Sequence, residues 1–299
     1  MAGADWFIDS AVWMARATGV SRVIIGATVV SVATTLPEFA VSVLAAHLGH
    51  PDVAVGNAVG SCIANVGLIL GAVLLARRAR VNRQVFSRNM WLLLAVTAMF
   101  LILSADGKLS RGDGLALLLF MAFYVREAVR MGRSSQGAEE DRAAALAESS
   151  WGRRILIFCA GAALVTGGSR ALVWSGTRLA AALGVPELVV GLTLVAVGTS
   201  LPELVTAVAA TIKGHQELSV GNVMGANVLD LTWVMGVAAL VRPLPIAPST
   251  RLLDLPAMAI MVALLAVTGL TGGQLSRREG LVLLTAYAVY LALLRWWFW

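Results

Sequence analysis

The sequence predicts an all-α polytopic membrane protein that consists of two inverted repeats of five helices each. The first observation is composition: 59% of the 299 residues are hydrophobic and only 13% are charged, whereas a soluble domain has about 25% charged residues. The second is segment length, because continuous apolar runs of about twenty residues fit membrane helices and not the shorter alternating segments of a β-barrel. The third is an internal repeat.

The repeat relates two segments, 21–71 and 186–236, which align without a gap when the numbering is shifted by 165. Of the 51 aligned positions, 17 are identical. The identical positions form two motifs, Thr-x-Leu-Pro-Glu at 34–38 and 199–203, and Gly-Asn-x-x-Gly at 56–60 and 221–225. Hydrophobic segments that recur with Pro and Gly at matching places are typical of secondary transporters.

Ten apolar helices are predicted, five in each repeat. Their expected ranges are 7–17, 20–46, 52–75, 89–104, 113–131, 154–180, 186–211, 217–241, 254–270 and 279–298. An odd number of spans in each repeat places the second copy in the membrane upside down relative to the first. The chain therefore divides into a first repeat (1–131), a linker (132–153) and a second repeat (154–299).

The first helix is expected to be truncated. The second repeat has an apolar run over 154–167 before Gly168, and the corresponding run before Gly3 is missing. The first helix is therefore expected to be too short to span the bilayer. Either the native chain begins upstream of Met1, or the protein has lost half a helix.

The positions of Lys and Arg predict the orientation in a plasma or inner membrane. With the linker in the cytoplasm, 16 basic residues lie on the inner side and six on the outer side. This is the bias expected from the positive-inside rule, and it puts both termini outside. The net charge of +6 therefore reflects topology, and nucleic acid is not an expected partner. The two cysteines, Cys62 and Cys159, form neither a disulfide framework nor a metal-ligand spacing, and no covalent cofactor is expected.

The Thr-x-Leu-Pro-Glu motif predicts a helix that is broken beside a carboxylate. Thr34 and Glu38 are four residues apart and share one helical face, as do Thr199 and Glu203. The proline between them removes a backbone hydrogen bond and displaces the carbonyl four residues earlier. Unwound backbone is tolerated at membrane depth only where it faces protein or a polar cavity. Carbonyls, a hydroxyl and a carboxylate together suit a hard cation such as calcium, which takes about six to eight oxygen ligands.

The next helix of each repeat is predicted to complete this site. Ser61 and Asn65 are again four residues apart, and Asp230 stands at the position that matches Asn65. The small residues of the Gly-Asn-x-x-Gly motifs allow close helix approach, and their asparagines are expected to hold helices together. Charged groups at membrane depth cost about 2.5–3.5 kcal/mol each. Three carboxylates, those of Glu38, Glu203 and Asp230, would therefore require a divalent ion, several monovalent ions or protons.

The motifs at 34–38 and 56–65, and at 199–203 and 221–230, closely resemble the α-repeats of the sodium/calcium exchanger family of cation/calcium antiporters, in its prokaryotic branch. The resemblance covers nearly the whole chain. It implies a ten-helix fold with a cluster of cation sites at the repeat interface. The protein is expected to be a monomer. The resemblance also implies how that cluster is built. Calcium would be held by Glu38 and Glu203 with backbone oxygens at Thr34 and Thr199. Sodium would be held by the same glutamates with Ser61, Ser200 and Thr35, and Asn65 and Asp230 would line the middle of the cluster.

The sequence departs from the family pattern at a few of these positions. Ala226 stands where the family usually has a serine, so one sodium site loses a hydroxyl. Thr35 replaces the usual serine and keeps the oxygen, and Cys62 replaces an asparagine whose partner Asn227 is retained. The acidic residues are intact, which favours divalent binding over sodium coupling.

Two transport mechanisms and two other classes remain open at this point. The first mechanism is calcium/sodium antiport by alternating access, and the second couples calcium or another divalent ion to protons, which Ala226 favours slightly. A passive channel is disfavoured by the inverted symmetry. An intramembrane enzyme is disfavoured because neither HExxH nor a nucleophile paired with a base is present.

Overall fold

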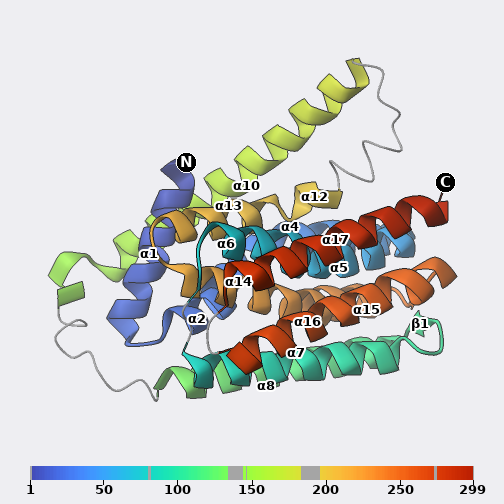
Figure 1. Ribbon diagram of the computed structural model, residues 1–299, viewed down its shortest axis with the longest axis horizontal. Helices are drawn as coiled ribbons and strands as arrows, with labels where there is room; N and C mark the ends of the chain where they lie inside the picture. The colour runs from blue at the N-terminus through green and yellow to red at the C-terminus, as the bar shows by residue number, and fades with distance from the viewer. Residues whose placement is uncertain are drawn as a thin grey trace.

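A computed structural model describes residues 2–79, 82–133, 144–145, 147–182, 196–272 and 275–298. Almost all of these residues are helical, and most of the helices run side by side along the long axis of the molecule (Figure 1). In the described part of the chain, six helices are long and apolar enough to cross a membrane, or seven if one bent pair counts as a single span. The protein is thus a polytopic α-helical membrane protein, as predicted.

The first half contains α-helical segments interrupted by two π-helical segments, η1 and η2. In chain order they are α1 (Ala2–Thr18), α2 (Arg22–Ile25), η1 (Gly26–Val30), α3 (Ser31–Thr34), α4 (Leu36–Leu48), α5 (Pro51–Ala64), η2 (Asn65–Leu70), α6 (Gly71–Ala76), α7 (Arg83–Leu103) and α8 (Arg111–Arg133). The predicted 20–46 helix is broken at its proline motif, as expected, with a 47° bend between α3 and α4. The first helix begins at Ala2, five residues earlier than predicted, and its 17 residues make it about 25 Å long.

The second half repeats this pattern. Its elements are α10 (Trp151–Ala182), α12 (Ala196–Thr199), α13 (Leu201–Ile212), α14 (Gln216–Leu229), η4 (Asp230–Val234), α15 (Met235–Val241), η5 (Thr250–Asp254), α16 (Leu255–Gly272) and α17 (Arg277–Phe298). The start of the predicted 186–211 helix and half of the 132–153 linker lie outside the described residues. Two short strands, β1 (Lys108–Leu109) and β2 (Leu244–Pro245), pair antiparallel, a feature that the sequence analysis did not predict.

The loops show that the two repeats are inverted. At one end of the α5–α6 helix, Ala79 forms a bridge with Leu275, and Arg277 donates to the Ala76 carbonyl. At the other end, the guanidinium of Arg242 lies against Gly49, and strands β1 and β2 pair. Positions that match under the 165-residue shift, such as 77 and 242 or 110 and 275, thus lie at opposite ends of the molecule.

Helices α5–α6 and α14–α15 form the centre. In the most apolar 18-residue stretch of each span, 78% of Pro51–Ala76 and 83% of Gln216–Val241 is buried, whereas only 11% of Arg277–Trp296 is buried, which places that helix at the periphery. Glycines allow α14 to contact the backbone of α2 and η1: a Cβ added at Gly221 would lie 2.1 Å from the Val23 carbonyl oxygen, and one at Gly225 would lie 2.3 Å from that of Ala27. The expected close approach is therefore present in the second repeat.

The first-repeat glycines differ. Within the described residues, a Cβ at Gly56 or Gly60 meets no atom within 4 Å. The residues that would match Val23 and Ala27 under the repeat shift are 188 and 192, which lie outside the described residues.

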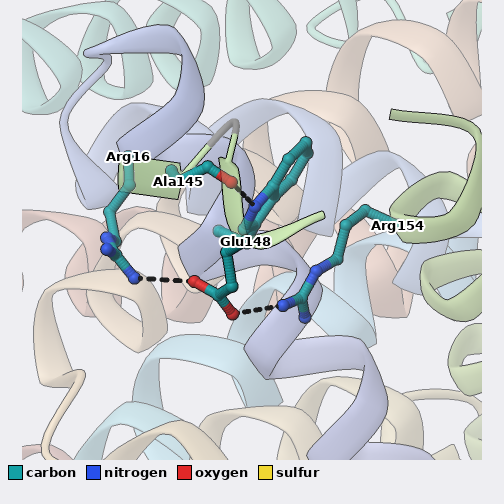
Figure 2. A network of polar contacts seen from close by, with 5 residues as sticks. Arg16, Ala145, Glu148 and Arg154 are labelled. Atoms are coloured by element: carbon teal, nitrogen blue, oxygen red, sulfur yellow. Dashed lines mark hydrogen bonds and ion pairs between the residues drawn. The ribbon is translucent and has the colours of Figure 1, made fainter. Parts of the chain in front are cut away.

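The described end of the linker holds α1 against α10. Glu148 forms ion pairs with Arg16 at the end of α1 and with Arg154 in the first turn of α10 (Figure 2). The indole nitrogen of Trp13 donates to the Ala145 carbonyl at 2.8 Å. Because α1 and α10 occupy matching places in the two repeats, this network joins the repeats at one face of the molecule.

Candidate cation-binding site

Both repeats have a helix break at the same position. Thr35 separates α3 from α4 with φ −79° and ψ −3°, and Ser200 separates α12 from α13 with φ −85° and ψ 6°. Pro37 and Pro202 lie in the first turn of the helix that follows each break, where a proline is tolerated because its N–H is not needed. Neither proline can donate to the carbonyl four residues earlier, so the break is encoded locally.

The two breaks bring Glu38 and Glu203 into the interior. Each carboxylate is in the first turn of its helix and only 1% exposed. The N-terminus of a helix favours negative charge, which offsets part of the cost of burying these groups. Glu38 is close enough to Glu203 and to Asp230, also 1% exposed, for their charges to interact. The three predicted carboxylates therefore share one region.

Each glutamate faces the break of the other repeat. The Ser200 hydroxyl lies 3.5 Å from Glu38 Oε1 and 3.1 Å from the Ser61 hydroxyl. The hydroxyls of Thr34 and Thr35 lie near the Glu203 carboxylate, but that of Thr35 forms no hydrogen bond. Since Thr35 and Ser200 are matching positions, each break places a hydroxyl near the acid of the opposite repeat.

Asn65 and Asp230 are as buried as the glutamates, and each begins a π-helical segment, η2 or η4. Single π-helical turns occur frequently at functional sites. The amide of Asn65 donates to Asn227 Oδ1 at 3.0 Å, and the amide of Asn227 donates to the Cys62 carbonyl at 3.1 Å. The Cys62 thiol is 3.9 Å from Asp230 Oδ2. Cys62 and Asn227 are matching positions, so the two repeats cross at this pair.

Six of the nine predicted site residues carry a buried side-chain oxygen without a hydrogen-bond partner. These oxygens belong to Glu38, Glu203, Asp230, Asn65, Thr35 and Thr199. Leaving a buried acceptor unpaired costs about 1–3 kcal/mol, and more if it is charged. Buried polar atoms in proteins are otherwise nearly always satisfied. A concentration of unpaired oxygens at one place indicates a site for cations.

Among the described residues, no ion pair includes Glu38, Glu203 or Asp230, so no cationic side chain in this part of the chain neutralises these acids. In the same part of the chain, no three Asp, Glu, His or Cys side chains are grouped so that they could hold one metal ion. An ion at this site would therefore combine few carboxylates with neutral oxygens from hydroxyls, amides and carbonyls, as hard cations accept.

A surrounding network positions the site, and sequence reasoning identified only part of it. The expected helix-joining role of the asparagines is visible, since Asn57 donates to the Glu38 carbonyl at 3.2 Å and to Ser42, and Asn222 donates to Thr206 at 3.4 Å. Thr206 and Ser42 were not predicted. Neither residue belongs to a repeated motif, and only its position one helical turn after a glutamate indicates that it could contact the site.

Tyr124 of α8 was also missed. Its hydroxyl donates to the Ala27 carbonyl in η1 at 2.7 Å. An aromatic residue in an apolar helix carries no sequence signal for such a contact.

An inverted-repeat membrane protein with unneutralised acids buried between its repeats is a cation transporter of the antiporter class. The family model for "Sodium/calcium exchanger protein" matches residues 1–127 and 154–296. The chain belongs to the sodium/calcium exchanger family.

Several relatives match over nearly the full chain. The inner membrane protein YrbG of Escherichia coli is 36% identical over 98% of this chain and 92% of its own length. The sodium/calcium exchanger MaX1 of Methanosarcina acetivorans is 30% identical over 98% and 94%. Solved structures of the sodium–calcium exchanger NCX_Mj superpose with a TM-score of 0.84, at 30% identity, over 97% of this chain and 93% of theirs. The fold and the family are thereby shown.

Proposed function

We propose that this protein exchanges calcium for sodium across the membrane by alternating access. The observation that carries the proposal is the set of six unpaired, buried oxygens contributed by both repeats. Calcium would be bound by Glu38 and Glu203 with backbone oxygens at Thr34 and Thr199. Sodium would use the same glutamates with Ser61, Ser200 and Thr35, and Asn65 and Asp230 would line the middle. The relatives MaX1 and NCX_Mj are named as sodium/calcium exchangers, which supports these two ions.

Shared ligands are the physical basis of the exchange. If calcium and sodium compete for the same carboxylates, only one set of ions is bound at a time. An empty site would leave three buried acids close together without a counter-charge, which is costly at membrane depth. The site would therefore change its exposure only when it is filled, and transport of one ion would require return of the other.

The two repeats also differ in a way that supports alternating access. Thr34 donates to Asn222 Oδ1 at 3.3 Å, whereas Thr199, its match in the second repeat, has a buried hydroxyl without a partner. Inverted repeats that adopt two different conformations can exchange them, and the exchange exposes the site to the other side. We further propose that the protein is a monomer with both termini outside, that its linker is cytoplasmic, and that the transported ions bind near the midplane.

Calcium-45 uptake into proteoliposomes tests the proposal. An outward sodium gradient should drive uptake, and a potassium gradient should not. Equal uptake without any imposed gradient, or unitary currents in a planar bilayer, would indicate a passive pore instead.

Proton coupling is the second candidate. It is favoured by Ala226, which is fully buried and places a methyl group where Ser61 places a hydroxyl in the first repeat. One neutral sodium ligand is thereby lost, while the carboxylates that could carry protons remain. Calcium uptake driven by a pH gradient and indifferent to sodium would select this mechanism.

A further inference from the structure

Arginines from three parts of the chain converge on one pocket at the end of the molecule where Ala79 meets Leu275. Arg22 begins α2, Arg77 and Arg78 follow α6, and Arg277 begins α17. The pocket has a volume of about 600 Å³, and the α13–α14 turn completes its walls with Gly214, Gln216 and Glu217. It is separate from the candidate cation site, which lies in the interior between the helix breaks.

In the part of the chain that the structure describes, no ion pair neutralises the positive charge of this pocket. Within the described residues, none of the four arginines takes part in an ion pair, although Glu217 lines the same pocket. The contacts that the arginines make are with neutral groups: Arg277 donates to the Ala76 carbonyl at 3.4 Å, and the Gln216 amide, with its oxygen turned toward Arg77, accepts from Nε at 3.0 Å. The lining residues therefore carry three net positive charges.

The repeat symmetry shows that this convergence is not required by the fold. Arg77 has a basic match, Arg242, and the two occupy corresponding environments beside Gly214 and Gly49. The other three arginines have no basic match: the corresponding sequence positions are Glu187, Pro243 and Gly112. The positive-inside tendency accounts for an excess of basic residues on one side, but not for their meeting in one pocket.

We propose that this pocket binds the phosphate group of an anionic phospholipid. Guanidinium groups bind phosphate oxygens in a bidentate manner, and basic pockets between transmembrane helices at the membrane surface are suited to lipid head groups. Exposed leucines lie beside the arginines, Leu75 in the last turn of α6 and Leu281 four residues after Arg277 in α17, with 44% and 58% of their surfaces exposed. These leucines give the acyl chains of the same lipid an apolar surface, which a soluble phosphate would not need.

Native mass spectrometry of the purified, full-length protein tests this assignment. The wild type should retain phosphatidylglycerol in preference to phosphatidylcholine. Because each basic group contributes about fivefold to binding of an anionic lipid, the R77Q/R277Q variant should bind phosphatidylglycerol more than tenfold less well. The second variant, R22Q/R78Q, leaves the Arg277–Ala76 contact in place and should show a similar loss of phosphatidylglycerol binding. A loss in both variants would show that the effect does not come from misfolding of R77Q/R277Q.

The matched control is R242Q/R251Q, which removes two arginines from the opposite end of the molecule, where Arg242 lies against Gly49 and Arg251 lies against Gly107. This control should retain phosphatidylglycerol as the wild type does. Equal retention by all variants, or equal loss in the control, would overturn the proposal. Inorganic phosphate is the second probe: if it binds the wild type as tightly as phosphatidylglycerol does, the site takes free phosphate and the lipid assignment is wrong.

Discussion

Thr34 Oγ1 donates a hydrogen bond to Asn222 Oδ1 across 3.3 Å, and thereby ties the helix break of the first repeat to the central helix of the second. Thr199 occupies the matching place in the second repeat, and its buried hydroxyl has no partner. The two repeats have similar sequences but are not in the same conformation. Under the alternating-access proposal, the opposite state pairs Thr199 with Asn57 and releases Thr34.

Valine substitutions of these two threonines should shift that equilibrium in opposite directions. Thr34→Val removes the hydrogen bond to Asn222 that forms in this conformation, and Thr199→Val removes a hydroxyl that has no partner in the same conformation. Both substitutions keep the side-chain shape and the backbone oxygens. A buried hydrogen bond contributes about 1 kcal/mol, or roughly fivefold in population. Calcium affinity measured from each side of oriented vesicles should therefore move in opposite senses for the two variants. Shifts in the same sense would argue against the exchange of conformations.

Glu203→Gln should reduce calcium uptake at least 100-fold. The substitution keeps the size of the side chain and its position beside Thr34 and Thr35, but it removes a charged ligand that a divalent ion requires. Uptake in proteoliposomes is the measurement, with size-exclusion chromatography as a check that the variant is folded. Wild-type flux in this variant would exclude Glu203 as a ligand.

Ala226→Ser should strengthen sodium coupling. The position is fully buried beside the site and matches Ser61, whose hydroxyl lies 3.1 Å from that of Ser200. A serine adds one neutral oxygen of the kind that a sodium ion binds, and we expect the sodium concentration for half-maximal exchange to fall about threefold or more, a change of roughly 0.6 kcal/mol. Ala226→Val adds bulk without an oxygen and serves as the control. An unchanged sodium dependence would place the sodium ligands elsewhere.

Gly221→Ala should destabilise the protein. A Cβ at Gly221 would lie 2.1 Å from the Val23 carbonyl oxygen. Overpacking costs about 1–3 kcal/mol, so the thermal unfolding midpoint in detergent should fall by several degrees. An unchanged midpoint would contradict the close packing of α14 against the backbone of α2.

Lys213 links the α13–α14 turn to α1 through Asp9 and Asp5, at 2.7 and 3.2 Å. Burial lowers the pKa of Lys213, but the hydrogen bonds to the two aspartates outweigh it and the pKa is raised above 10.5. A raised pKa adds stability that is complete below pH 10.5 and is lost as the pH rises through the folded-state value. Since the pair is partly exposed, Lys213→Met should lower the unfolding midpoint by only about 1–3 °C. The difference should vanish in strongly alkaline buffer, and a difference that persists there would point to packing instead.

The part of the fold that could be predicted follows from the covalent structure of single residues. Pro37 and Pro202 lack an N–H wherever they stand, so a helix break before each glutamate could be predicted from sequence, and the internal repeat then placed the two breaks together. Most helix ends in the described part of the chain lie within three residues of those predicted, because apolar length largely determines a membrane helix; the starts of α1 and α7 lie five and six residues earlier than predicted.

The unpredicted part depends on packing. The π-helical segments that begin at Asn65 and Asp230 require a hydrogen-bond register that no local residue enforces. The contact between Cys62 and Asn227 could not be predicted either, because a cysteine in an apolar run looks like any other small core residue. The asymmetry between Thr34 and Thr199 could not be predicted at all, since the two motifs are alike and only the conformation differs.

Direct binding of calcium-45 to the purified protein tests most directly whether the two repeats form one shared site. Calcium should bind the wild type and be displaced by sodium. Glu38→Gln and Glu203→Gln should each abolish calcium binding to the same extent as the double variant, because either change removes one carboxylate of the same pair of ligands. Calcium binding of wild-type affinity in either single variant would show that the carboxylates of Glu38 and Glu203 do not act together, and the account would be wrong.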